Sequence, residues 1–362
     1  MLRLSGRAHG RPESRSMSEI LVTGGEGNLG RHLVPALLRR GNRVRVLVAR
    51  GTDPRWFERR GAAVHPGDVR EPESLMRPMR GVDAVVHLSE LAPGWHPLAD
   101  YQTINVAGTE NVCRAALQGG AGRVVHVSSW TVYGLDLSQP AREEFLLRPM
   151  SEPYALTKAA GDLAVERMIV DEHLPAVILR PGAIFGPGNR ANFGRIADRL
   201  RARQALIIGS GDNALPLVYV SDVVKALVLA LEHDHAVGQA YNIGNDVPLT
   251  QRQVLDAIAE QIGAPRARLH VPYRLLSRAS GIAERMALRT RAEDPLITRY
   301  CVRLFGGDNR LAIDKARHEL GYRPAVSVHE GIKRAAVWYR SQRRLPPTPE
   351  PKLIAASEAP IP

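Results

Sequence analysis

The stretch Ile20-Leu-Val-Thr-Gly-Gly-Glu-Gly-Asn-Leu-Gly30 predicts a strand that turns directly into a helix. The first three residues are apolar, and after the glycines an apolar pattern of helical spacing runs from Leu29 to Leu38. Glycines at positions 24, 27 and 30 allow a tight turn and a close approach of backbone to a phosphate. The unpaired N–H groups of the helix start also favour an anion. Taken alone, the stretch fits both a nucleotide site and an ordinary strand-to-helix turn.

The chain continues as alternating strands and helices. A second strand, residues 44–48, follows the first helix at once, which completes a βαβ-like unit. Later apolar runs predict strands over residues 61–69, 82–88, 123–129 and 175–180, and helical patterns cover residues 73–79, 104–117 and 154–170. This alternation predicts an α/β fold with a doubly wound parallel sheet, in which ligands bind beyond the carboxyl ends of the strands. Asp68, Leu88 and Ser129 fall at such ends.

Two regions of the chain lose the alternation and are rich in Arg, Pro and Gly. We expect residues 187–216 and 246–340 to form a smaller substrate-binding lobe, and the short strands near 217–245 to return to the first domain, residues 17–186. Residues 1–16 predict a disordered basic extension, and Met17 is the expected working start. The proline-rich residues 345–362 predict a disordered tail.

Composition excludes several classes of protein. Two cysteines in 362 residues do not make a disulfide framework, which favours a reducing, cytoplasmic location. No apolar run approaches the ~20 residues of a membrane span. The net charge of +12 raises the question of a nucleic-acid partner, but the arginines are scattered and lack interleaved aromatics, so we expect none. No His, Cys, Asp or Glu cluster has the spacing of metal ligands.

Tyr154-Ala-Leu-Thr-Lys158 places a phenol and an ammonium on one face of a helix. A nearby ammonium favours phenolate, so we expect Lys158 to lower the pKa of Tyr154 toward the working pH. Such a tyrosine exchanges a proton with an alcohol or a carbonyl. Upstream, Ser129 ends a predicted strand, where its hydroxyl can polarise the same oxygen, with Ser128 as the fallback. A surface Tyr–Lys pair and a polar turn are the alternatives for each motif alone.

The order of these motifs, T-G-x-x-G-x-x-G, Ser-Ser and Tyr-x-x-x-Lys, resembles the extended short-chain dehydrogenases/reductases of the NAD-dependent epimerase/dehydratase family. The resemblance covers about residues 18–340. The remaining blocks that carry it are Asp68-Val69, His87-Leu88-Ser89, Asn105-Val-Ala-Gly-Thr109, Leu179-Arg-Pro-Gly-Ala-Ile-Phe-Gly-Pro-Gly188, Val218-Tyr-Val-Ser-Asp222 and Tyr241-Asn-Ile-Gly244. The late blocks, residues 295–300 and 316–324, resemble the 3β-hydroxysteroid dehydrogenase-like branch.

The resemblance implies a Rossmann sheet, an NAD(P) cofactor, a small-molecule substrate and a homodimer. It implies four catalytic residues: Ser129, Tyr154, Lys158 and Asn105, which supports the lysine side through water. The residues that it places against the cofactor are Gly24, Gly27, Asn28, Leu29, Gly30, Arg50, Asp68, Val69, Leu88, Ser89, Lys158, Pro181, Ala183 and Ile184.

The choice between NADP and NAD depends on the end of the second strand. An acidic residue there would bind both ribose hydroxyls and favour NAD. The strand ends Val46-Leu-Val-Ala-Arg50 without an acid, and Arg50 is placed to meet a 2′-phosphate. We therefore favour NADP slightly, while an Arg50 that points to water would leave NAD open.

The family reduces ketones, oxidises sterols, epimerises nucleotide sugars or dehydrates them. Dehydratases carry an Asp-Glu pair after the catalytic threonine, and Trp130 and Thr131 hold those places here. We expect a dehydrogenase for a secondary alcohol or ketone on a largely apolar, sterol-like substrate. A nucleotide-sugar epimerase with tightly bound NAD is the alternative, and a non-catalytic NAD(P) sensor is a remote one. The mixed apolar and basic stretch 273–289 fits a pocket wall, a membrane-surface helix or a plain lobe helix.

Overall fold

The computed structural model describes residues 18–134, 137, 139–290 and 298–342. The predicted extension (residues 1–16), the predicted tail (residues 345–362) and residues 295–297 of the late block lie outside the described residues. The first domain is built on a seven-stranded parallel sheet in the order β11-β6-β5-β4-β1-β2-β3. Its strands are β1 (Glu19–Thr23), β2 (Arg43–Val48), β3 (Ala63–Pro66), β4 (Ala84–His87), β5 (Arg123–Val127), β6 (Ala176–Pro181) and β11 (Ala240–Ile243).

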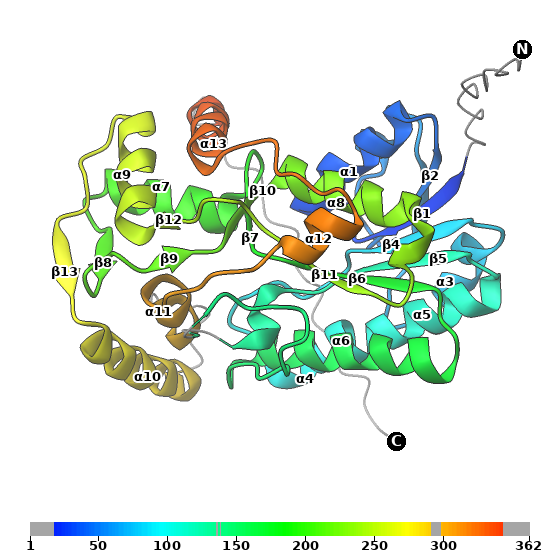
Figure 1. Cartoon of the computed structure of the whole chain (residues 1–362), viewed down its shortest axis with the longest axis horizontal. Helices are drawn as coiled ribbons and strands as arrows, with labels where there is room; N and C mark the ends of the chain where they lie inside the picture. The colour runs from blue at the N-terminus through cyan, green and yellow to red at the C-terminus, as the bar shows by residue number, and fades with distance from the viewer. Residues whose placement is uncertain (1–17, 135–136, 138, 291–297, 343–362) are drawn as a thin grey trace, which may run out of the picture.

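Helices cover both faces of this sheet, as Figure 1 shows. On one face, α1 (Asn28–Arg39) and α8 (Val220–Glu232) pack side by side over the apolar residues of β1, β2 and β6. On the other face, α3 (Pro72–Met79), α5 (Gly108–Gly119) and α6 (Pro153–Asp171) enclose a second apolar cluster. Because helices cover both faces of the sheet, its strands are the nearly continuous apolar runs seen in the sequence. The predicted doubly wound α/β fold is confirmed.

The order of the strands reverses between β1 and β4. The chain builds β2 and β3 to one side of β1, and then crosses to place β4, β5 and β6 on the other side. In sheets of this kind the ligand binds where the direction reverses, because the loops that leave the two central strands turn to opposite faces of the sheet. Here the glycine turn after β1 lies close to the backbone of the loop after β4, and both carry predicted cofactor residues.

The helix predicted over residues 104–117 is one part of a longer helical segment. It begins as α4 (Leu98–Tyr101), passes through a π-helical turn (Gln102–Ala107) and continues as α5. An extra residue per turn rotates the side chains that follow it, and π-turns of this kind are frequent at functional sites. The π-turn contains Asn105, whose side chain is buried.

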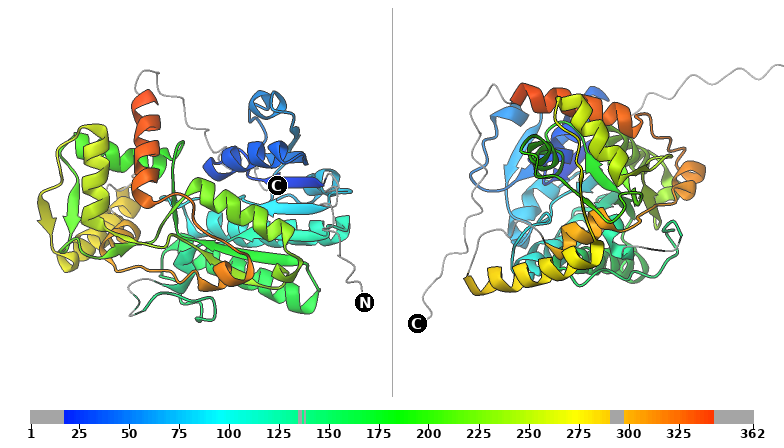
Figure 2. Two further views of the ribbon diagram at one scale, coloured as in Figure 1. Left: turned by 45° about the horizontal axis from the view of Figure 1, so that its top comes forward. Right: turned by 90° about the vertical axis from the view of Figure 1, so that its left-hand side faces the viewer.

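The smaller lobe lies beside the carboxyl ends of the strands (Figure 1, left; Figure 2). Three of its helices, α7 (Arg195–Arg201), α9 (Gln251–Ile262) and α13 (Val328–Gln342), share an apolar cluster. A smaller cluster joins α10 (Tyr273–Thr290) and α11 (Arg299–Gly306) to β8 (Leu206–Ile208). The remaining elements are β7 (Ala183–Phe185), β9 (Ala214–Leu215), β10 (Leu217–Tyr219), β12 (Leu249–Thr250), β13 (Leu269–Val271), α2 (Arg55–Glu58) and α12 (Asp314–Glu319), with a π-turn (Arg190–Gly194) and two 3₁₀ turns (Trp130–Tyr133, Asp234–Ala236).

The two returning strands behave differently. β11 pairs with β6 and becomes the edge of the main sheet. β10 instead pairs with β7 in a separate two-stranded sheet. β10 is three residues long because α8 already begins at residue 220. Its partner β7, which follows β6 along the chain, has the same length.

Candidate active site

The glycine turn joins β1 to α1 and leaves no room for a side chain at Gly24 or Gly30. Gly24 has a φ of +64°, and a Cβ there would lie 2.7 Å from the backbone nitrogen of Ser89 on the loop after β4. A Cβ on Gly30 would lie 2.4 Å from the carbonyl oxygen of Gly25. Gly27 caps α1, so the free N–H groups of the helix open directly on the turn. This backbone cradle fits the pyrophosphate of a dinucleotide.

The flank of the turn is tied to other loops. The Asn28 amide donates to the carbonyl oxygen of Pro187 (2.9 Å), which follows β7, and Leu29 packs against the apolar clusters of both domains. The N–H groups of Leu88 and Ser89 both donate to the hydroxyl of Thr23 at the end of β1. The loops after β1, β4 and β7 are therefore held together, and those after β1 and β4 carry the predicted cofactor residues Gly24, Gly27, Leu88 and Ser89.

Two charged side chains stand at the end of β2. Arg50 forms an exposed ion pair with Glu71 (2.6 Å). Glu26, from the glycine turn, accepts a hydrogen bond from the N–H of Ala49 (3.2 Å), and its other carboxylate oxygen is buried without a partner among the described residues. Glu26 was missed in the sequence because the acid was sought after β2, whereas this carboxylate reaches the strand end from another loop.

The end of β3 carries the predicted cofactor residues Asp68 and Val69. Asp68 forms a bidentate ion pair with Arg70, and this bond is the first cause of the lowered pKa of Asp68. Val69 is buried, and its carbonyl oxygen accepts from Asn111 on α5. The two residues thus lie at one strand end, with Asp68 toward solvent and Val69 toward the core.

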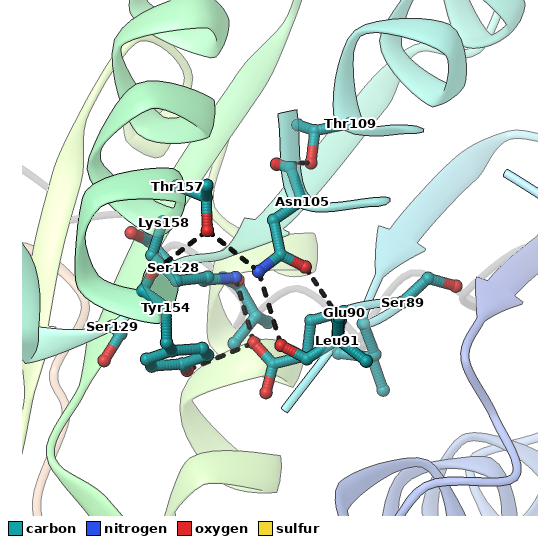
Figure 3. A network of polar contacts seen from close by, with 12 residues as sticks. Ser89, Glu90, Leu91, Asn105, Thr109, Ser128, Ser129, Tyr154, Thr157 and Lys158 are labelled. Atoms are coloured by element: carbon teal, nitrogen blue, oxygen red, sulfur yellow. Dashed lines mark hydrogen bonds and ion pairs between the residues drawn. The ribbon is translucent and has the colours of Figure 1, made fainter. Parts of the chain in front are cut away.

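Tyr154 and Lys158 lie one turn apart at the start of α6, and both are buried. The Lys158 ammonium donates to the carbonyl oxygen of Val127 at the end of β5 (2.7 Å). Ser129, two residues further, hydrogen-bonds to Tyr154, and its Oγ also accepts from the Thr131 hydroxyl (2.9 Å). The structure therefore brings Ser129, Tyr154 and Lys158 together, as Figure 3 shows.

Ser128, the fallback for Ser129, faces away from this group. Its hydroxyl donates to the Asp162 carboxylate (2.6 Å), which is also bound by the guanidinium of Arg180 on β6 (2.8 Å). Asp162 and Arg180 are both buried, and Arg180 also pairs with Glu166. Ser128 thus belongs to a buried network that joins α6 to β5 and β6.

Asn105 braces the loop after β4. Its side-chain oxygen accepts from the N–H of Leu91 (2.7 Å), while its amide donates to the carbonyl oxygen of Leu91 (3.3 Å) and to the Thr157 hydroxyl (3.2 Å). Thr157 lies on α6, beside Lys158. Asn105 therefore contacts the residues around Lys158 directly, whereas the resemblance implies a contact through water.

Glu90 was not identified from the sequence, yet its carboxylate lies between the two central groups. It is 3.1 Å from the Lys158 ammonium and accepts a hydrogen bond from the Tyr154 hydroxyl (3.3 Å). Figure 3 shows the three side chains converging. The sequence predicts only cofactor contacts for the loop after β4. The separation of Glu90 and Tyr154 along the chain gives no sign that their side chains meet.

The pKa of Tyr154 runs opposite to the sequence-based expectation. Burial raises it well above the usual range, and the Glu90 carboxylate raises it further, while the hydrogen bond from Ser129 opposes the rise. The expected lowering of the Tyr154 pKa toward the working pH is wrong in this structure, because burial and the Glu90 carboxylate raise it. Tyr154 is therefore held as a neutral phenol, a proton donor.

An apolar cavity lies in the core of the smaller lobe. Its walls come from β7, α7, α9, β10 and α11, and of the described residues that line it only Asn192 is polar. The predicted cofactor residues Ala183 and Ile184 are part of the wall, and Pro181 ends β6 just before them. Helix α10, a candidate pocket wall in the sequence, contributes none of the described lining residues; Leu304 and Phe305 of α11 lie there instead.

Helix α11 connects the cavity to the catalytic group. The Tyr300 ring packs edge-on against the Tyr154 ring, with centroids 6.1 Å apart. Leu304 lies four residues later, on the same face of the helix and about 6 Å along its axis. Helix α11 therefore contacts Tyr154 through Tyr300 and lines the cavity through Leu304.

Comparison with known proteins shows to which family the chain belongs. The model of the NAD dependent epimerase/dehydratase family matches residues 20–244. The chain belongs to this family. It is thus an NAD(P)-dependent enzyme of the extended short-chain dehydrogenase/reductase type, and the family resemblance seen in the sequence is confirmed.

Named relatives of this extended short-chain enzyme span nearly its whole length. It is 33% identical to a 2-alkyl-3-oxoalkanoate reductase of Stenotrophomonas maltophilia, over 87% of this chain and 98% of the relative. It is 27% identical to a sterol-4-alpha-carboxylate 3-dehydrogenase of Mus musculus, over 89% and 92%. Its fold matches DesIV, a dTDP-glucose 4,6-dehydratase of Streptomyces venezuelae solved with NAD bound, with a TM-score of 0.74, 28% identity and coverage of 90% and 98%. Among its described helices, none has the length and apolar character of a membrane span.

Proposed function

We propose that this enzyme interconverts a secondary alcohol and a ketone on a largely apolar substrate, by hydride transfer with NADP(H) or NAD(H). The buried group of Ser129, Tyr154 and Lys158, which can exchange a proton with the oxygen of an alcohol or a ketone, is the observation that carries the proposal. The apolar cavity of the smaller lobe has no charged side chain in its described lining, which fits an apolar ligand better than a diphosphate. The printed names of the reductase and sterol relatives fit the same substrate class.

The nicotinamide, when bound, supplies or accepts the hydride at the substrate carbon. The chain's own residues then handle the oxygen. Tyr154 Oη donates its proton to the carbonyl oxygen as that oxygen receives the electron pair of the C=O π bond, and in the reverse direction it takes the proton back. Ser129 holds the same oxygen through a second hydrogen bond, and the Lys158 ammonium stabilises the charge left on the phenol. Lys158 would also hold the nicotinamide ribose, and the glycine turn the pyrophosphate.

The cofactor preference is set, in this proposal, by two opposed charges at the end of β2. Arg50 favours a 2′-phosphate and so NADP, which we favour slightly. The Glu26 carboxylate, with one buried oxygen free of partners among the described residues, favours two ribose hydroxyls and repels a phosphate.

The decisive experiment uses the purified full-length protein. It is denatured to identify any nucleotide that it releases, and is separately mixed with NADPH or NADH and a series of ketones of increasing alkyl length. An oxidoreductase is expected to oxidise added nucleotide, with KM falling as the chain grows. Tightly held NAD near one per chain, together with turnover of a nucleotide sugar and none of any ketone, would establish the epimerase instead.

A further inference from the structure

The loop after β4 presents a carboxylate to both partners of the proton-transfer pair. Glu90 accepts from the Tyr154 hydroxyl at 3.3 Å and pairs with the Lys158 ammonium at 3.1 Å. Lys158 is buried, and the Glu90 side chain is 31% exposed, so the carboxylate is at the rim of the catalytic group. Figure 3 shows it opposite the phenol, on the side away from Ser129.

The backbone around Glu90 is fixed from both sides. Before it, the N–H groups of Leu88 and Ser89 donate to the Thr23 hydroxyl. After it, Leu91 exchanges two hydrogen bonds with the Asn105 side chain. These bonds fix the backbone on both sides of Glu90, so the loop holds the base of its side chain at the rim of the catalytic group.

Groups from five elements face the Tyr154 phenol. They are Glu90 from the loop after β4, Ser129 from the end of β5, Lys158 from α6 itself, and the rings of Tyr101 on α4 and Tyr300 on α11. Two further ionisable groups, Glu152 and Cys301, act on Tyr300 rather than on Tyr154. Of the facing groups, Glu90 is the carboxylate, and its negative charge opposes phenolate while its oxygen accepts the phenol proton.

We propose that Glu90 is a positioning residue of this active site: its carboxylate holds Lys158 in place and keeps Tyr154 in the proton-donating form. The proposal rests on the proposed function. Its consequence is a direction of pH dependence. Ketone reduction, which needs the phenol, proceeds at neutral pH, whereas alcohol oxidation, which needs the phenolate, requires a higher pH than it would without Glu90.

The first test observes Tyr154 directly and needs no substrate. Full-length protein is labelled with ¹³Cζ-tyrosine, and the Tyr154 resonance is assigned by its loss in Tyr154→Phe. Glu90→Gln and Glu90→Ala should each titrate at a pH about one unit or more below wild type. Glu110→Gln is the matched control, because Glu110 also pairs with a cation (Arg114, 3.6 Å) and its side chain is 29% exposed. This control should leave the Tyr154 titration unchanged.

An unchanged Tyr154 titration in a folded Glu90 variant would overturn the proposal. Both Glu90 variants remove the negative charge. The test can therefore be completed with either one, if the other does not fold. The titration is independent of the substrate, so a failure to find any active ketone would count against the proposed function and leave this result standing.

The second test uses turnover with the active ketone and its alcohol. In Glu90→Gln, the pH of half-maximal oxidation kcat should fall by about one unit or more, and the ratio of oxidation kcat to reduction kcat at neutral pH should rise. KM for nucleotide should rise, because Lys158 loses one of its two partners. Loss of both directions with intact nucleotide binding would show instead that Glu90 transfers protons itself, and would contradict the positioning role.

Discussion

At the scale of single residues, the phenol of Tyr154 is the group on which turnover depends. Replacing Tyr154 by Phe removes the proton donor and keeps the ring that packs against Tyr300. We expect kcat to fall by about 10²- to 10⁴-fold, with nucleotide affinity nearly unchanged. Tyr300→Phe is the control, since the described structure gives its hydroxyl no hydrogen bond, and it should keep near-normal turnover. Near-normal turnover of a folded Tyr154→Phe would refute the catalytic assignment.

Nucleotide choice is a second prediction at this scale. Glu26→Gln removes the negative charge at the end of β2, and Arg50→Ala removes the positive one. The first change should raise the affinity for NADPH relative to NADH, and the second should lower it, each by roughly tenfold for a charge contact of about 1.4 kcal/mol. Dissociation constants from nucleotide fluorescence measure both. Parallel changes for the two nucleotides would contradict a role at the 2′ position.

The residues that sequence alone predicted are those whose chemistry follows from local spacing. Gly24, Gly27 and Gly30 lie in one turn, and Tyr154 and Lys158 share one helix face, so no knowledge of the fold is needed to group them. Glu26 and Glu90 act across loops that are distant in sequence from their partners. Their roles depend on which strand ends meet, and that order is a property of the sheet.

At the scale of elements, the walls of the cavity determine which chains fit. Ile196 lies on α7 and lines the cavity, so Ile196→Phe should narrow it. We expect KM for long-chain ketones to rise by about 10- to 200-fold while short ketones are little affected. Leu231→Phe on α8, partly buried but away from the cavity, is the control. Equal effects on short and long ketones would indicate general damage rather than a shortened cavity.

The join between α6 and β6 depends on a buried ion pair. Asp162 and Arg180 bind at 2.8 Å with side chains 0% and 1% exposed. Asp162→Asn leaves the Arg180 charge only partly compensated, so we expect the free energy of unfolding to fall by about 3 to 5 kcal/mol. The exposed pair of Glu330 and Arg334 is the comparison, and Glu330→Gln should cost less than about 1 kcal/mol. Denaturant unfolding measures both, and similar losses in the two variants would contradict the argument.

Strands and helices of the first domain were predictable because each shows its period in the sequence. The π-helical turn around Asn105 and the pairing of β10 with β7 were not, because neither leaves a periodic signal. The first is a single extra residue in a helix that otherwise reads as regular. The second involves two very short strands, and the pairing of such strands depends on packing in the folded protein more than on local sequence preference.

At the scale of the whole molecule, the last part of the chain completes both domains. Asp222, buried at the start of α8, accepts from the N–H groups of Ala325 and Val326, just before α13. Asp222→Ala should therefore lower the free energy of unfolding by about 2 to 6 kcal/mol, because two N–H groups lose their acceptor. Lys225→Ala, which removes an exposed bond from the same helix to Arg323, should cost far less. An unchanged free energy of unfolding in Asp222→Ala would show that the bonds to Ala325 and Val326 do not stabilise the attachment of this part of the chain.

One apolar cluster contains both Ile20 of β1 and Tyr322, which follows α12. A ribosome adding about 5 to 20 residues per second needs roughly 15 to 60 seconds to go from the first of these residues to the second. Throughout that interval the apolar face under α1 and α8 is incomplete, and the strands that have already emerged present unpaired edges. During its synthesis the protein is therefore a client for chaperones that shield nascent chains, and its yield in a cell should depend on them more than its final stability would suggest.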